Sequence, residues 1–157
     1  MVEITKSTLV SSIWSNFYDR IKDQVTSVDI SISPGSQTIQ TYASSYSQVT
    51  FTSKSNFPIL VINSPKIPQE QFTLGKTKVN GTIDIEVYAT NSQAADKFLD
   101  AINNAIETYK GDFADLGLHQ IELDDSNSDF VEQGDIKTHI RGSRFRFVYY
   151  FSRTTAY

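Results

Sequence analysis

The stretch that most constrains the fold is residues 82–110, where a strand pattern runs directly into a helix pattern. Apolar and polar residues alternate over 82–89, which is the spacing of a β-strand with one buried face. Over 95–109 the apolar residues recur every three or four positions, which predicts a helix with one apolar stripe. A strand and a helix whose apolar faces meet form the nucleus of a two-layer domain. The predicted helix caps are Asn91 or Ser92 at the start and Gly111 at the end.

Length and composition bound the class of protein. The 157 residues predict one domain, 1–157, with a single core. A net charge of -4 gives no general electrostatic support to non-specific DNA binding. The chain has no cysteine, so disulfides and thiolate metal sites are excluded. We read no signal peptide and no membrane-spanning run, and expect a protein used in the cytoplasm or carried in a particle assembled there.

The N-terminal region predicts a second helix, over about residues 6–24, with Ser7 or Thr5 as its cap. Its apolar face has two adjacent rows. We expect both rows to meet the core of the domain, the alternative being that one packs on another subunit. The rows are Leu9, Ile13, Phe17 and Ile21, and Val10, Trp14 and Tyr18.

The remaining patterns predict strands, which with the two helices on one face give a single α+β domain with a mostly antiparallel, mixed sheet. Asn80-Gly81 predicts a tight hairpin. A two-residue loop there would place Lys76 and Lys78 on the apolar face of the hairpin. We therefore expect either a bulge near Gly75 or a strand that extends beyond the core and leaves the two lysines in solvent. The expected segments are a strand at 28–33, a long polar loop at about 34–56 with a short strand at 48–52, a central strand at 57–62, a hairpin from 72–79 into 82–89, a short strand at 116–123 and a long strand at 136–152 that could bend at Gly142.

Few residues point to catalysis, and we predict no enzyme, no cofactor and no metal. His119 and His139 lie in no metal or triad motif, so a structural or surface role is favoured for both. The spacing of Asp125, Asn127 and Asp129 matches the first half of a calcium loop. The second half fails, because Phe130 replaces the required Gly and Ile136 the bidentate Glu.

Two groups of charged residues are candidates for interaction. The first is an acidic loop predicted at 124–135, containing Asp124, Asp125, Asp129, Glu132 and Asp135. The second group consists of the arginines of the last strand and the acids of the strand at 82–89. We expect the arginines to pair with acids on a neighbouring strand or subunit. The residues of this group are Arg141, Arg144, Arg146, Asp84 and Glu86. Single-stranded nucleic acid is disfavoured as their partner by the negative net charge and the lack of an RNA-binding signature.

The order of these elements, with GTIDIEVYATNSQAADKFLDAINNAIE followed by RGSRFRFVYYFS, resembles the tail terminator or tail completion proteins of long-tailed phages and related viruses. The shared features are a strand ending in a pair such as Tyr88-Ala89, a helix starting in a pair such as Ala95-Asp96, and a basic, aromatic closing strand. The resemblance covers about Ser7 to Ser152, and the serine-rich stretch at 36–55 matches nothing in it.

The resemblance implies a non-enzymatic virion structural protein, placed in the tail or neck and assembled in the host cytoplasm. Its subunits would form a homohexameric ring that caps the tail tube, fixes the tube length and joins it to the head connector. The partners implied are the tail tube protein, a connector or adaptor protein, and genomic DNA that passes through without specific binding. The acidic loop would line the passage, and the second charged group would lie at subunit interfaces.

Three other readings stay open. The protein could be another neck component, such as a head-completion or adaptor protein. It could be a non-catalytic ligand-binding α+β module that uses its Ser/Tyr-rich loop as the binding surface. The last is a small enzyme that combines a carboxylate pair with His119 or His139.

Overall fold

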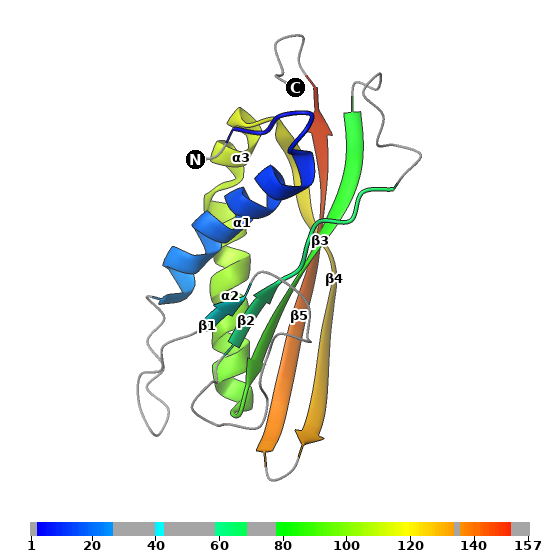
Figure 1. Ribbon diagram of the computed structural model, residues 1–157. Coiled ribbons are helices and arrows are strands. Elements are labelled where there is room, and N and C mark those ends of the chain that lie inside the picture. The colour runs from blue at the N-terminus through cyan, green and yellow to red at the C-terminus, as the bar shows by residue number, and fades with distance from the viewer. Residues whose placement is uncertain (1–2, 27–39, 43–58, 69–77, 134–135, 152–157) are drawn as a thin grey trace.

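The computed structural model describes residues 3–26, 40–42, 59–68, 78–133 and 136–151 (Figure 1). The elements in chain order are α1 (Leu9–Thr26), β1 (Gln40–Tyr42), β2 (Ile59–Ile62), β3 (Lys78–Ala89), α2 (Ser92–Thr108), α3 (Lys110–Asp115), β4 (Leu118–Gln133) and β5 (Ile136–Tyr150). The strands expected at 28–33 and 48–52, most of the polar loop at 34–56, the first arm of the hairpin up to Thr77 and the position of Asp135 lie outside the described residues.

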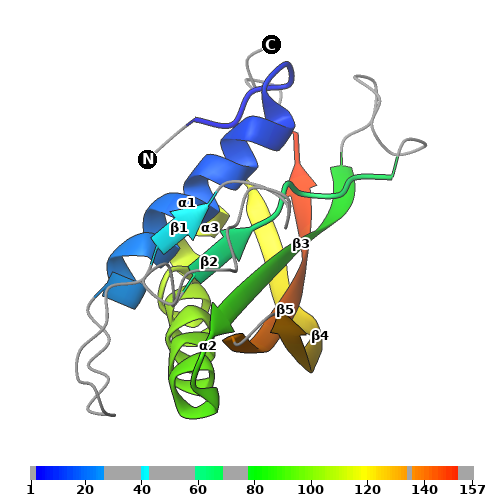
Figure 2. The same cartoon turned by 60° about the horizontal axis from the view of Figure 1, so that its bottom comes forward.

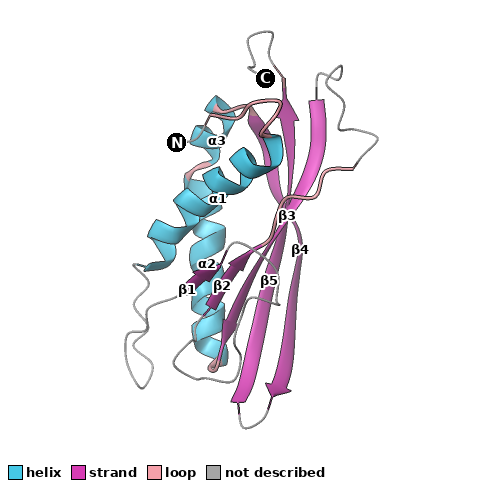
Figure 3. Cartoon of the chain, viewed as in Figure 1, coloured by secondary structure: helices cyan, strands magenta, loops and turns pink. Residues whose placement is uncertain are grey.

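The strands form one five-stranded sheet in the order β1-β2-β3-β5-β4. Among the described strands β1 and β2 pair in parallel, and the other pairs are antiparallel. The helices lie on one face of this sheet (Figures 2 and 3). The predicted fold class is therefore confirmed, with the short α3 as a helix that the sequence pattern did not predict. No helix in the described ranges is long and apolar enough to cross a membrane.

The core lies between the sheet and the helices. The face of β3 that meets the core carries Ile83, Ile85 and Val87, all fully buried. The apolar stripe predicted for α2 packs against this face, with Phe98 and Ile102 fully buried. Asn91 caps α2 as predicted, since its side chain accepts hydrogen bonds from the backbone N–H groups of Gln93 at 2.8 Å and Ala94 at 3.2 Å.

The predicted end of α2 at Gly111 is wrong. The helix ends at Thr108, and after Tyr109 the chain begins α3, which contains Gly111. The backbone of Gly111 does not adopt the left-handed conformation that a glycine helix stop uses. The short helix is held by Phe113, which is fully buried and stacks on Phe17 with ring centroids 4.7 Å apart.

In α1 one apolar row meets the core fully and the other does not. Leu9, Ile13, Phe17 and Ile21 are all buried. Val10 is 38% exposed, while Trp14 packs at the margin of the core and donates its indole N–H to the carbonyl of Ile62 at 2.9 Å. The expectation that both rows are buried in the core is thus wrong for Val10. Thr5, one of the two predicted caps, accepts from the N–H of Thr8 at 3.2 Å.

The hairpin predicted at Asn80-Gly81 is wrong, because β3 continues through both residues and pairs with β5 along its whole length. A Cβ atom on Gly81 would lie 2.6 Å from Cζ of Phe147 on the neighbouring strand. Glycine is therefore required for the close approach of an aromatic ring rather than for a turn. Lys78 is exposed and Val79 is buried, so the lysine points away from the apolar face, as the alternation requires.

The acidic loop predicted at 124–135 is also wrong, because the short strand expected at 116–123 continues to Gln133 as β4. Asp, Ser and Asn favour turns when only their own sequence is considered. Here partners on β5 hold them extended: Asp125 lies opposite Arg144, and the ring of Phe130 lies 5.1 Å from that of His139.

A β-bulge near the start of β4 changes which residues face the core. The register shifts between His119 and Glu122, and Gln120 has a positive φ of 54°. As a result Leu118 and Ile121 are both buried, whereas the regular alternation of a strand would place His119, Ile121 and Leu123 on one side. Leu123 is 50% exposed. The strand β5 continues through Gly142, where a Cβ atom would lie 2.2 Å from Oδ1 of Asn127.

Replacing Gly81 by Ala should lower the free energy of unfolding by about 1–3 kcal/mol, because the new methyl group overlaps the Phe147 ring. Urea denaturation measures the loss. Gly111→Ala is the matched control: no atom lies within 4 Å of its Cβ position, and alanine favours the helix. If the overlap with the Phe147 ring causes the loss, Phe147→Leu should lower the free energy of unfolding by less in the Gly81→Ala background than in the wild type. Simple additivity of the two substitutions would contradict it.

Candidate interaction surface on the open face and edge of the sheet

The face of the sheet opposite the helices, called the outer face below, carries a chain of charged side chains. It begins at Asp84 in the middle of β3. Asp84 lies opposite Arg144 of β5, which in turn lies opposite Asp125 of β4. The alternation of β3 that buries Ile83 and Ile85 necessarily points Asp84 to the other side. Opposite charges therefore alternate across three neighbouring strands.

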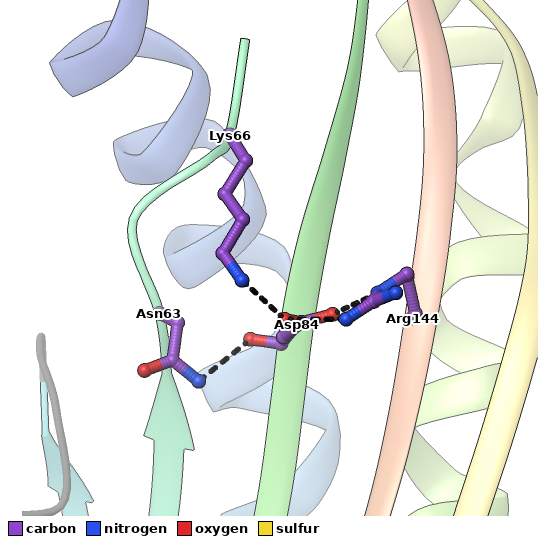
Figure 4. Close-up of polar contacts among 4 residues, drawn as sticks. All are labelled: Asn63, Lys66, Asp84 and Arg144. Atoms are coloured by element: carbon purple, nitrogen blue, oxygen red, sulfur yellow. Dashed lines mark hydrogen bonds and ion pairs between the residues drawn. The ribbon is translucent and has the colours of Figure 1, made fainter. Parts of the chain in front are cut away.

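Asp84 is the centre of this surface (Figure 4). Its carboxylate accepts from Nε of Arg144 at 2.7 Å and from Nη2 at 3.4 Å, and Nζ of Lys66 lies 3.5 Å away. The backbone carbonyl of Asp84 accepts from the N–H of Asn63 at 3.0 Å and from its side-chain amide at 3.3 Å. One residue of β3 thus holds both β5 and the connection that leaves β2.

The environment lowers the pKa of Asp84. Partial burial raises the pKa of this carboxyl, but the hydrogen bond and charge of Arg144, together with the charge of Lys66, outweigh the burial. The net shift is below the ordinary aspartate value. The carboxylate therefore stabilises the fold above the ordinary pKa, and that contribution is lost as the pH falls through the depressed one.

A second, more exposed group of charges lies toward the edge of the outer face. Arg146 donates to Glu122 of β4, and its Nη1 lies 4.0 Å from the carboxylate of Asp124. The hydrogen bond and charge of Arg146 lower the pKa of Glu122. Both side chains of the Arg146–Glu122 pair are more than half exposed, so the pair contributes little to stability.

The predicted group of interface charges is divided between the two faces. Arg141 lies on the helix side, where its Nε contacts the carboxylate of Asp96 on α2 at 2.8 Å. Glu86, expected to pair with an arginine, instead accepts a hydrogen bond from the hydroxyl of Tyr88. The pairing of Arg144 with Asp84 is confirmed, within a single chain.

The acidic residues predicted to form a loop lie on the exposed edge strand. All of Asp124, Asp125, Asp129 and Glu132 are exposed. Asp129 accepts a hydrogen bond from the backbone N–H of Phe130 at 2.7 Å. In the part of the chain that the structure describes, Asp125, Asp129 and Glu132 form no ion pair. The strand β4 contains no Lys or Arg, so this edge is strongly negative.

A hollow of about 990 Å³ opens on the outer face between the connection after β2 and the bulged start of β4. Lys66 and Ile67 lie on one side and Gln120 and Glu122 on the other, with Val148 between them. It offers both signs of charge together with apolar surface, and its volume is in the range of small-molecule binding sites. Lys66 was missed in the sequence because it lies in a proline-flanked connection with no periodic pattern.

The two histidines lie far apart along the sheet. His119 is opposite Val148 and its ring is 5.4 Å from that of Tyr150, whereas His139 packs beside Phe130. Within the described ranges no cluster of three or more His, Asp or Glu side chains forms a metal-binding group. The calcium-like spacing from Asp125 to Asp129 lies on an extended strand, which does not wrap around an ion as a calcium loop does.

Replacing Asp84 by Asn should lower the free energy of unfolding by about 1 kcal/mol near neutral pH, because Arg144 and Lys66 lose their shared carboxylate. The difference from the wild type should begin to shrink below about pH 4, where the carboxyl of the unfolded chain takes up its proton, and should be lost as the pH falls through the depressed pKa of the folded state. Denaturation curves at several pH values measure this.

Glu122→Gln is the control for this experiment, because it breaks an equally direct pair with Arg146 on a more exposed part of the same face. It should leave the unfolding curve unchanged at every pH. A loss in Asp84→Asn that is the same in acid as at neutral pH would show that the carboxylate charge is not its cause.

Comparison with known proteins identifies no family for this chain. No protein-family model matches this chain, and no curated protein matches it. The resemblance to tail terminators seen in the sequence pattern stays a prediction, and the charges, contacts and free edge of the described residues carry the functional argument.

Proposed function

We propose that this protein is a virion structural protein, a tail terminator whose subunits form a hexameric ring. The ring caps the tail tube, fixes the tube length and joins it to the head connector, with DNA passing through its centre. No catalysis and no cofactor are part of this role. The partners are further copies of the chain, the tail tube protein and a connector or adaptor protein.

The observation that carries the proposal is the exposed acidic edge of the sheet. Four of the nine residues from Asp124 to Glu132 are acidic, all four are exposed, and β4 carries no basic residue. Such a strand repels DNA phosphates, because it offers no cation that could release the counterions of the duplex. A wall with this charge lets a nucleic acid pass without being held. We therefore place β4 at the passage of the ring.

The ion pairs inside the chain strengthen this charge argument. Arg144 is held by Asp84, and Arg141 by Asp96. Arg146 pairs with Glu122 in the same way, so the three arginines of β5 are paired within the subunit, while Lys137 is exposed opposite Glu132. Among the described residues Asp125 and Asp129 form no ion pair, so they leave negative charge on the outer face. Arg144 and Arg146 remain the best candidates for contacts at subunit interfaces, because their side chains are 45% and 59% exposed.

A ligand-binding module is the second candidate, and the hollow on the outer face favours it. Its binding surface would then be the hollow around Lys66 rather than the Ser/Tyr-rich stretch at 36–55. Another neck component would share the acidic edge, so it is separated from a terminator only by its partner in the virion.

The first test is the state of assembly. Light scattering over a concentration series, with negative-stain images of the same fractions and of fractions mixed with tail tubes, should show rings with a central hole that cap the tubes. The ring is expected because a subunit with an open sheet edge has surface left for identical neighbours. A strict monomer that never associates with tubes would reject the terminator and leave the ligand-binding module as the leading proposal.

The charge of the passage can be tested separately with Asp124→Lys, Asp125→Lys and Asp129→Lys in one chain, all at exposed positions of β4. Rings of this variant should retain duplex DNA, and the binding should weaken steeply as salt rises above about 0.1 M, because each lysine contacts phosphate. Wild-type rings should release the same DNA. Fluorescence anisotropy of a labelled duplex measures both.

The matched control carries the same change of charge elsewhere: Glu3→Lys, Asp100→Lys and Asp115→Lys, all at exposed positions outside β4. Its rings should retain less DNA than those of the β4 variant, since its lysines lie away from the passage. Equal retention by the two variants would show that β4 does not line the passage.

A further inference from the structure

We infer that the free edge of β4 is the contact through which one subunit joins the next, by pairing with the β1 edge of a second copy so that the sheet continues from subunit to subunit. This inference rests on the proposed function and names the interface of its ring. The contact is head-to-tail: each subunit uses β4 toward one neighbour and β1 toward the other.

The first support is the open backbone of β4. It is 16 residues long and is the last strand of the sheet, paired with β5 on one side only. The N–H and C=O groups on its other side have no strand partner among the described residues. Leu123 and Phe130, two large apolar residues on this strand, are 50% and 47% exposed. A long edge with exposed apolar side chains is a template for another strand.

The charge of β4 decides which strand can occupy this edge. If two copies paired β4 to β4 around a two-fold axis, the acidic stretch from Asp124 to Glu132 would face its own copy. Like charges placed opposite each other across a strand pair are destabilising. The symmetric dimer is therefore disfavoured, and the partner edge must be one without acidic residues.

The opposite edge of the same sheet meets this requirement. Among the described strands β1 is the last one at that end, and its residues Gln40, Thr41 and Tyr42 carry no charge. Following the strand pairings across the sheet, β1 and β4 run in opposite directions. In a ring of identically oriented subunits, β4 of one copy therefore meets β1 of the next as an antiparallel pair. A head-to-tail contact of this kind closes into a ring when the rotation between copies permits.

Edge pairing also leaves the acidic side chains available. Strand pairing uses backbone groups in the plane of the sheet, while side chains point to its two faces. Asp125 and Asp129 lie opposite Arg144 and Ile140 of β5 and so share the outer face. They would stay exposed in the assembled ring. The same strand can therefore join neighbours through its backbone and repel DNA through its side chains.

Cross-linking through introduced cysteines tests the contact, because the natural chain contains no cysteine. The test variant carries Ser128→Cys on β4 and Thr41→Cys on β1. Within one subunit these strands lie four strand spacings apart, about 19 Å. A bismaleimide shorter than this distance links them only between copies. The reaction is run on concentrated protein and on protein mixed with tail tubes.

The double variant should give a ladder of linked species that ends at the closed ring on a denaturing gel. A mixture of the two single variants should give dimers only, and each single variant alone should give no linked species. The control pair Asn104→Cys and Thr41→Cys places the first cysteine on an exposed position of α2 and should not form the ladder.

Each contrary result has one meaning. Linked dimers from Ser128→Cys alone would show β4 pairing with β4 and overturn the inference. A ladder from the control pair would show random collision and also overturn it. Rings seen by microscopy without β4–β1 links would reject this contact while keeping the terminator proposal. A ladder from protein that never caps tubes would support the contact and reject the terminator proposal.

Discussion

The structure depends on the antiparallel pairing of β3 with β5 along twelve residues of β3. This register places Ile83 beside Phe145 on the helix side and Asp84 beside Arg144 on the outer face. One alignment thus builds the core and the charged surface together. A shift of one residue would exchange the two faces, so burial of the apolar set against α2 also fixes which charges meet. The polar surface is in this sense a by-product of hydrophobic packing.

Local patterns predicted the parts of the fold that local forces decide. The alternation in β3, the apolar stripe of α2 and its Asn91 cap are properties of short windows, and all three are confirmed. The Arg144–Asp84 pair was also predictable, because both residues lie on the polar faces of neighbouring strands. The errors arise where distant residues decide: Gly81 gives room to Phe147, and Asp125 is held extended opposite Arg144. No window around Gly81 or Asp125 contains those partners.

The candidate surface was predicted in its residues but not in its form. The acidic stretch was identified as a loop because Asp, Ser and Asn favour turns, yet it is the edge of the sheet. That difference changes its use: a loop offers side chains alone, whereas an edge strand also offers a row of backbone donors and acceptors. Lys66 and the hollow beside it had no sequence signal, since they depend on how the connection after β2 lies over Thr82.

The bulge at Gln120 divides β4 into a part whose apolar side chains are buried and a part whose side chains are exposed. Before it and within it, Leu118 and Ile121 are anchored in the core; after it, every side chain from Glu122 to Phe130 is exposed. Substitutions in the second part therefore leave the buried contacts intact. The exposed part of this strand can therefore change in sequence to match a new neighbour while the contacts that bury Leu118 and Ile121 stay the same.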